Sequence, residues 1–160
     1  MPRRKSVNSI RDVGVDPVFG SNLVQKLINV VMWRGKKNAA RTIVYEAFDL
    51  LVKKANGDKD RALQMFHRGV EQICPAIEVR PRRVGGSVHQ IPTEVSEHRA
   101  RSLALRWLIN AAATRNDKTM GLRLGNELYD ASEGRGIAFK KKIDVHKMAE
   151  SNRAFSHYSW

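Results

Sequence analysis

Cysteine is almost absent from this sequence. Cys74 is the only one among 160 residues, so no internal disulfide can form and a zinc site built on several thiolates is excluded. No apolar run reaches the roughly 20 residues that a membrane-spanning helix needs. The opening residues MPRRKSVNSIRDVG are basic but lack the apolar core of a secretory signal. We therefore expect an intracellular protein in a reducing compartment, with no membrane partner.

Catalytic and nucleotide-binding motifs are also missing. The sequence has no GxxxxGK[ST], GxGxxG or GxSxG motif and no HxxxH pair. Glu94 and Glu97 lie three residues apart at a predicted helix start, where carboxylates interact favourably with the helix dipole. That structural role explains them without acid–base chemistry. We predict no enzyme activity, no cofactor and no metal site.

Acidic residues are scarce relative to basic ones. The chain has 29 Lys and Arg against 16 Asp and Glu, which gives a formal charge of +13 and a pI near 10.4. Such an excess favours a polyanionic partner, nucleic acid first and an acidic membrane surface second. Hydrophobic residues make up 42%, enough for one domain with a core. We predict a single domain over residues 1–160.

Apolar residues at helical spacing predict an all-helical body. Leu23, Leu27 and Val31 recur on one face of a first helix from about Asn22 to Arg34. A second helix is expected from about Ala39 to Ala55. A third, capped by Asp58 or Asp60, ends at Pro75. The other predicted helices start at Ser96 or Thr93, at Asp117 with an end near Gly134, and near Ile137. The fold class is mainly α, with about six helices and no expected homo-oligomer.

A β-ribbon arm is predicted over residues 77–95, between the third and fourth helices. Gly85 and Gly86 can both adopt positive φ in a tight hairpin turn, which pairs Val84 with Ser87 and Arg82 with His89. Neither side of the tip carries an apolar row, so we expect a basic arm standing off the body. Its cationic side chains are Arg80, Arg82 and Arg83.

Four further segments concentrate positive charge. Residues 1–17 read as a basic tail with Arg3, Arg4 and Lys5, ordered only on its partner. The connection RGKKNAAR carries Arg34, Lys36, Lys37 and Arg41 without an acid. Arg99, Arg101 and Arg106 lie on the polar side of the fourth helix, whose Trp107 is expected in the core. Residues 136–160 form a basic helix with Lys140, Lys141 and Lys142 and an aromatic tail. That tail could stack on nucleotides, dock on a neighbouring protein or pack back on the body.

Seven segments in order resemble the family of bacterial-type small-subunit ribosomal protein seven. They are MPRR at the start, DPVFGS, RGKKNAAR, EVRPRRVGG, SLALRWL, the EG-G-A-KKK region and MAESNRAFSHY. The resemblance covers essentially the whole chain. One departure is Trp33, which occupies the first interhelix turn where a polar or charged residue is expected.

The resemblance implies six helices with a ribbon arm and a primary binder of small-subunit rRNA. Such a protein nucleates assembly of the head, the 3′ major domain, and lies near the mRNA and tRNA exit site beside ribosomal proteins eleven, nine and thirteen. Its implied location is the bacterial cytoplasm or an organelle stroma. The implied rRNA-binding residues are Arg3, Arg4, Lys5, Lys36, Lys37, Arg99, Arg101 and Arg106, and the positive charge of the first interhelix connection adds Arg34 and Arg41 as predicted rRNA contacts. The implied rRNA or exit-site tRNA contacts are Arg80, Arg82 and Arg83, and we predict the same role for Gly85 and Gly86 of the ribbon turn and for Lys140, Lys141 and Lys142.

Two other functions fit parts of the sequence. A basic ribbon on a helical body is similar to architectural DNA-binding proteins that lay an arm in the minor groove, although these usually need a dimer with paired arms. A nuclease or RNA-modifying enzyme would also bind nucleic acid, but the chain has no recognisable grouping of acidic metal ligands.

Overall fold

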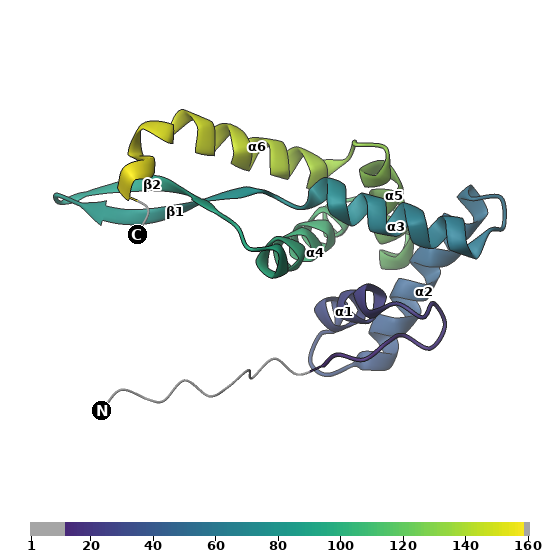
Figure 1. The fold of residues 1–160 in the computed structure, drawn as a ribbon. Coiled ribbons are helices and arrows are strands. Elements are labelled where there is room, and N and C mark those ends of the chain that lie inside the picture. The colour runs from purple at the N-terminus through teal and green to yellow at the C-terminus, as the bar shows by residue number, and fades with distance from the viewer. Residues whose placement is uncertain (1–11, 159–160) are drawn as a thin grey trace, which may run out of the picture.

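A computed structural model describes residues 12–158 of the chain. The elements are α1 (Asn22–Val31), α2 (Lys37–Lys54), α3 (Lys59–Ile73), β1 (Ile77–Val84), β2 (Ser87–Glu94), α4 (Glu97–Ala113), α5 (Met120–Ser132), α6 (Ile137–Ser151) and the 3-10 helix η1 (Arg153–Tyr158). Figure 1 shows helices α1 to α5 gathered at one end and the two strands extending away from them, with α6 alongside the strands. The predicted mainly-α fold with one hairpin between the third and fourth helices is confirmed. The predicted residues Arg3, Arg4 and Lys5 lie outside the described residues.

Helix α5 lies at the centre of the body and packs against α2, α3 and α4. Its Leu124 and Leu128 are fully buried. Small residues allow the close approach, since a Cβ added at Gly125 would lie 2.9 Å from the carbonyl oxygen of Ala47 on α2. Phe48 and Phe66, on α2 and α3, meet edge to face with ring centroids 5.2 Å apart. The core thus holds α2, α3 and α5 as one rigid unit.

Most helix ends agree with the prediction, but two do not. Helix α1 stops at Val31 rather than Arg34, because the chain turns between Trp33 and Lys36. Helix α5 is capped by Thr119, whose hydroxyl accepts the Leu122 N–H at 3.2 Å, and not by Asp117. Asp58 caps α3 as one of the two predicted choices and accepts two backbone N–H groups.

The predicted tail over residues 1–17 extends too far. Asp16 is fully buried, and its carboxylate accepts the backbone N–H groups of Val18 and Phe19, both at 3.0 Å. The Tyr45 hydroxyl donates to the same carboxylate at 2.8 Å. Burial, followed by this contact with the Asp16 carboxylate, raises the pKa of Tyr45. These bonds anchor the chain to α2 before α1 begins.

The ribbon has the predicted register, with Arg82 opposite His89 and Val84 opposite Ser87. The prediction that the ribbon stands off the body is wrong for part of its length. Helix α6 packs beside β1, η1 packs on β2, and Figure 1 shows α6 running above the ribbon. The His89 and Phe155 rings lie 4.6 Å apart. The aromatic tail therefore packs back on the ribbon through Phe155, and only the tip projects beyond it. In the part of the chain that the structure covers, no helix is long and apolar enough to cross a membrane.

Candidate nucleic-acid interface

The turn between α1 and α2 presents cations at a helix N-terminus. The Lys36 N–H donates to the Trp33 carbonyl at 3.0 Å, and the two central residues both have positive φ, 50° at Arg34 and 75° at Gly35. This geometry is a type I′ turn. Arg34, Lys36 and Lys37 are exposed. Lys36 is the N-cap residue of α2 and Lys37 its first residue, so Lys37 and Arg41 belong to the helix rather than to the predicted turn.

This helix end lacks the negative charge that normally stabilises one. The first turn of α2 contains no acidic residue and its N-cap makes no side-chain hydrogen bond. Unsatisfied N–H groups and the helix dipole favour an anion there, whereas Lys36 and Lys37 repel the dipole. Arg41, one turn further on, has a buried Nε without a hydrogen-bond partner in the described residues. A phosphate would satisfy the free N–H groups and neutralise these cations.

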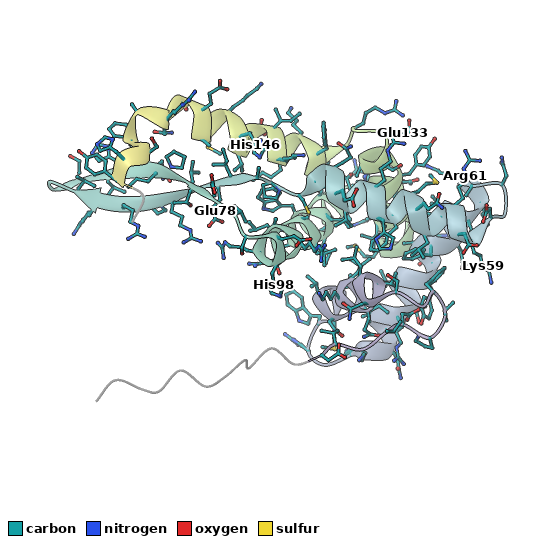
Figure 2. The ribbon with its side chains drawn as sticks, viewed as in Figure 1. Lys59, Arg61, Glu78, His98, Glu133 and His146 are labelled. Atoms are coloured by element: carbon teal, nitrogen blue, oxygen red, sulfur yellow. The ribbon has the colours of Figure 1, made fainter. Side chains whose placement is uncertain are left out.

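Glu78 organises the base of the ribbon. Its side chain is 9% exposed and binds Arg80 Nε at 2.5 Å and Arg99 Nε at 2.9 Å. Burial alone would raise the pKa of Glu78, but hydrogen bonds from Arg99 and Arg80 outweigh it and lower the pKa overall. One carboxylate thus ties β1 to the start of α4 and orients two of the predicted arginines. Figure 2 shows Glu78 on the ribbon near α4. Sequence reasoning missed Glu78, because the 21 residues that separate it from Arg99 carry no local signal of contact.

The other predicted residues of α4 are exposed. Arg101 pairs with Glu97 one turn earlier, and Arg106 Nε donates to the Ser102 carbonyl at 3.4 Å. Trp107 is half-buried and packs against the core, so its assignment away from the charged side is confirmed. Surface ion pairs of the Arg101 kind contribute only about 0–1 kcal/mol. Arg101 can exchange Glu97 for a phosphate at small cost.

The three consecutive lysines of α6 have different surroundings. Lys140 and Lys141 are exposed. Lys142 is half-buried and its Nζ donates to the Gln72 carbonyl at 2.7 Å, which ties α6 to the end of α3. Only the first two present their ammonium groups without a hydrogen bond to another described residue.

A groove lies between the ribbon and the C-terminal segment. It measures 840 Å³ and is lined from β1 by Arg80 and Arg82, and from the C-terminal segment by His146 and Arg153 among others. Burial, followed by the nearby Lys142, lowers the pKa of His146, and its Nε2 accepts the Ala76 N–H at 3.2 Å. The ribbon tip beyond the groove carries Arg83, Gly85 and Gly86, all exposed, as is Arg82 at the edge of the groove. Arginines from two segments thus line this one groove.

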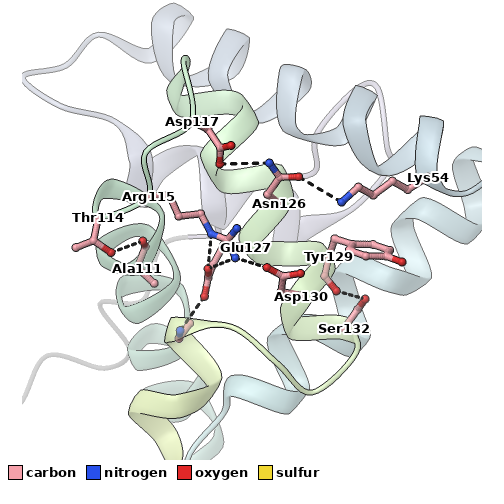
Figure 3. A network of polar contacts seen from close by, with 11 residues as sticks. Lys54, Ala111, Thr114, Arg115, Asp117, Asn126, Glu127, Tyr129, Asp130 and Ser132 are labelled. Atoms are coloured by element: carbon pink, nitrogen blue, oxygen red, sulfur yellow. Dashed lines mark hydrogen bonds and ion pairs between the residues drawn. The ribbon is translucent and has the colours of Figure 1, made fainter.

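A buried ionic network fixes α6 to the body (Figure 3). Glu127 is fully buried. Its carboxylate accepts from Arg115 at 2.6 Å and from the N–H of Ala138, in the first turn of α6, at 2.8 Å. Arg115 also pairs with Asp130. Burial alone would lower the pKa of Arg115, but the hydrogen bonds that it donates to Asp130 and Glu127 raise it overall. Among residues 12–158 no cluster of His, Cys, Asp and Glu is arranged to hold a metal ion.

Comparison with known proteins identifies the family. The model of the family described as "Ribosomal protein S7p/S5e" matches residues 2–153. This chain belongs to that family. It is 50% identical over 160 residues to the small ribosomal subunit protein uS7 of Mycoplasmopsis synoviae, with all of both chains covered. It is 52% identical over 161 residues to that of Phenylobacterium zucineum and 51% identical over 160 residues to that of Thermotoga petrophila, again over all of each chain.

Membership in the family establishes the class of molecule. The S7p/S5e proteins are structural components of the ribosome and not enzymes, so the predicted ribosomal family and the predicted absence of catalysis are both confirmed. A protein of the small subunit binds rRNA and other ribosomal proteins.

Proposed function

We propose that this chain is a primary small-subunit rRNA-binding protein that nucleates assembly of the head, the 3′ major domain. In this proposal it works in the bacterial cytoplasm, at the mRNA and tRNA exit site, beside ribosomal proteins eleven, nine and thirteen. The observation that carries the rRNA proposal is the acid-free, cationic N-terminus of α2. A rigid core holds it to the other basic elements, so the sites can bind one folded RNA together.

The proposed rRNA contacts fall on separate elements of the one fold. Arg34, Lys36, Lys37 and Arg41 bind phosphates at the first interhelix turn. Arg99, Arg101 and Arg106 bind along α4, and Arg3, Arg4 and Lys5 bind from the N-terminal segment. Arg80, Arg82, Arg83, Gly85 and Gly86 on the ribbon, with Lys140, Lys141 and Lys142 on α6, contact rRNA or exit-site tRNA.

The test is binding of the purified chain to a 3′ major domain fragment of small-subunit rRNA across a salt series. Each phosphate contact adds about 0.7–0.9 to the slope of log affinity against log salt. Lys36→Ala/Lys37→Ala should weaken binding and reduce the slope, with an unchanged circular dichroism spectrum. The matched control is Lys59→Ala/Arg61→Ala, at the start of α3 and far from the ribbon (Figure 2). There the acidic residues Asp58 and Asp60 lie beside the two cations.

Two results would contradict the proposal. Equal affinity for random duplex DNA at matched salt would remove the preference for rRNA. A loss of affinity that is the same in the control pair as in the Lys36 and Lys37 pair would show that net charge, rather than this helix end, determines binding.

A further inference from the structure

Trp33 is the most exposed large apolar side chain of the described residues. It is 74% exposed, although burying an indole is strongly favourable. Its backbone is fixed by the type I′ turn, because its carbonyl accepts the Lys36 N–H. No described residue accepts a hydrogen bond from its indole N–H. The side chain is therefore held at the surface by a rigid backbone, with no contact in the body that explains its size.

The surroundings of Trp33 combine an apolar floor with a cationic rim. A hollow of 310 Å³ is lined by Val31, Trp33, Ala39, Ala40 and Ile43 and edged by Arg34 and Lys36. From Pro17 to Tyr45 the sequence has five cations and no acid. Tryptophan is common in protein–protein interfaces, but lysine is depleted there. An aromatic face beside unpaired cations instead fits a nucleotide, whose base stacks while its phosphates bind the cations.

We propose that the Trp33 turn is a single-nucleotide site. One unpaired rRNA base stacks on the Trp33 indole, and Arg34 and Lys36 bind the phosphates on its two sides. Arg34 is one of two non-glycine residues with positive φ in residues 12–158, a conformation that carries a cost in backbone strain, and it lines the same hollow as Trp33. The proposal rests on rRNA binding and adds a base contact to it.

The experiment compares Trp33→Phe, Trp33→Leu and Trp33→Ala in the full chain, on the same rRNA fragment and salt series. Stacking predicts that Trp33→Ala weakens binding about five- to 150-fold. Trp33→Leu should lose most of that affinity, because it keeps apolar area without a π face. Trp33→Phe should retain more of the rRNA affinity than Trp33→Leu, because phenylalanine keeps a π face. The salt slope should not change in any of them, whereas Lys36→Ala should reduce it by about 0.7–0.9.

Fluorescence supplies an independent readout. Saturating rRNA should quench the wild type more than Trp33→Phe, in which Trp107 and Trp160 remain. The single-nucleotide site is refuted if Trp33→Ala binds rRNA as tightly as the wild type. It is also refuted if Trp33→Leu binds with full affinity, because the site is then merely apolar. It is also overturned if the two quenching curves coincide. If the melting temperature of a variant falls, its loss of affinity is not used, and the quenching comparison decides whether a base stacks on Trp33. Failure of the wild type to prefer rRNA over duplex DNA would instead refute the proposed function.

Discussion

Replacing Arg115 tests whether the buried network, rather than apolar packing alone, docks α6. In Arg115→Met the Glu127 carboxylate, fully buried, loses its 2.6 Å partner. Breaking a buried ion pair by removing one partner costs about 3–5 kcal/mol. Loss of the second ion pair, between Arg115 and Asp130, adds little to this cost. The Asp130 carboxylate is 34% exposed, and exposed pairs contribute about 0–1 kcal/mol.

The expected loss is therefore about 3–5 kcal/mol, against a typical total stability of about 5–15 kcal/mol. In a chain of this size each kcal/mol lowers the melting temperature by about 2–4 °C, so a fall of about 6–20 °C should follow. Urea unfolding monitored by circular dichroism measures the loss in unfolding free energy. In the variant, hydrogen exchange at the Ala138 amide, which donates to Glu127, should accelerate more than exchange at the core amides of α2.

Two comparisons make the Arg115 result interpretable. Arg61→Met, an exposed arginine on α3, should change stability by less than about 0.5 kcal/mol. Arg115→Met/Glu127→Gln keeps an amide oxygen for the Ala138 N–H but removes the buried charge, so it should be more stable than Arg115→Met alone. Two results would refute the buried-charge argument. One is a loss of stability below about 1 kcal/mol in Arg115→Met, and the other is a double variant that is less stable than Arg115→Met.

Three further outcomes are expected. Gly125→Ala should destabilise by about 1–2 kcal/mol despite its better helix propensity, because its Cβ would meet the Ala47 carbonyl at 2.9 Å; a gain in urea midpoint would contradict this. Glu78→Gln should cost about 1 kcal/mol at pH 7, since the partner Arg99 is 46% exposed. The lowered pKa of Glu78 means that this contribution is complete above the unfolded pKa of about 4.3 and disappears as pH falls through the folded value. Wild type and variant should therefore converge in acid. Joining Arg82 to His89 through a Gly-Gly turn should leave the melting temperature unchanged. Under the proposed exit-site role, it should weaken the retention of exit-site tRNA by purified subunits. If subunits with this variant lack the head proteins, the tip is instead an assembly element.

The hairpin could be predicted to the residue because its determinants are local. Gly85 and Gly86 set the turn, and the turn sets every pair along both strands. Its surroundings could not be predicted in this way. Phe155 reaches His89 from the end of the chain, and the strand pattern contains no apolar row that would announce a covering segment. The sequence therefore predicts a free arm, although α6 and η1 pack against the ribbon.

The start of α5 shows the same limit. Asp117 and Thr119 are both suitable N-cap residues, so composition alone does not choose between them. Thr119 is selected by a tertiary contact, because its hydroxyl binds the Glu46 carboxylate of α2 at 2.5 Å. Asp117 instead accepts from the Asn126 side chain at 3.2 Å. Neither partner is close enough in sequence for a capping rule to include it.

The charged residues of the candidate interface divide by whether an acid lies beside them. Arg99 and Arg101 are bound to Glu78 and Glu97, so a phosphate must compete with a carboxylate before it can bind there. The α2 N-terminus has no acid in its first turn, and phosphate binding there displaces only water and counterions. In the proposed complex with rRNA, the free energy gained per contact is thus larger at the first interhelix turn. RNA should dock at this turn first, and the arginines of α4 should exchange partners only once the RNA is already held.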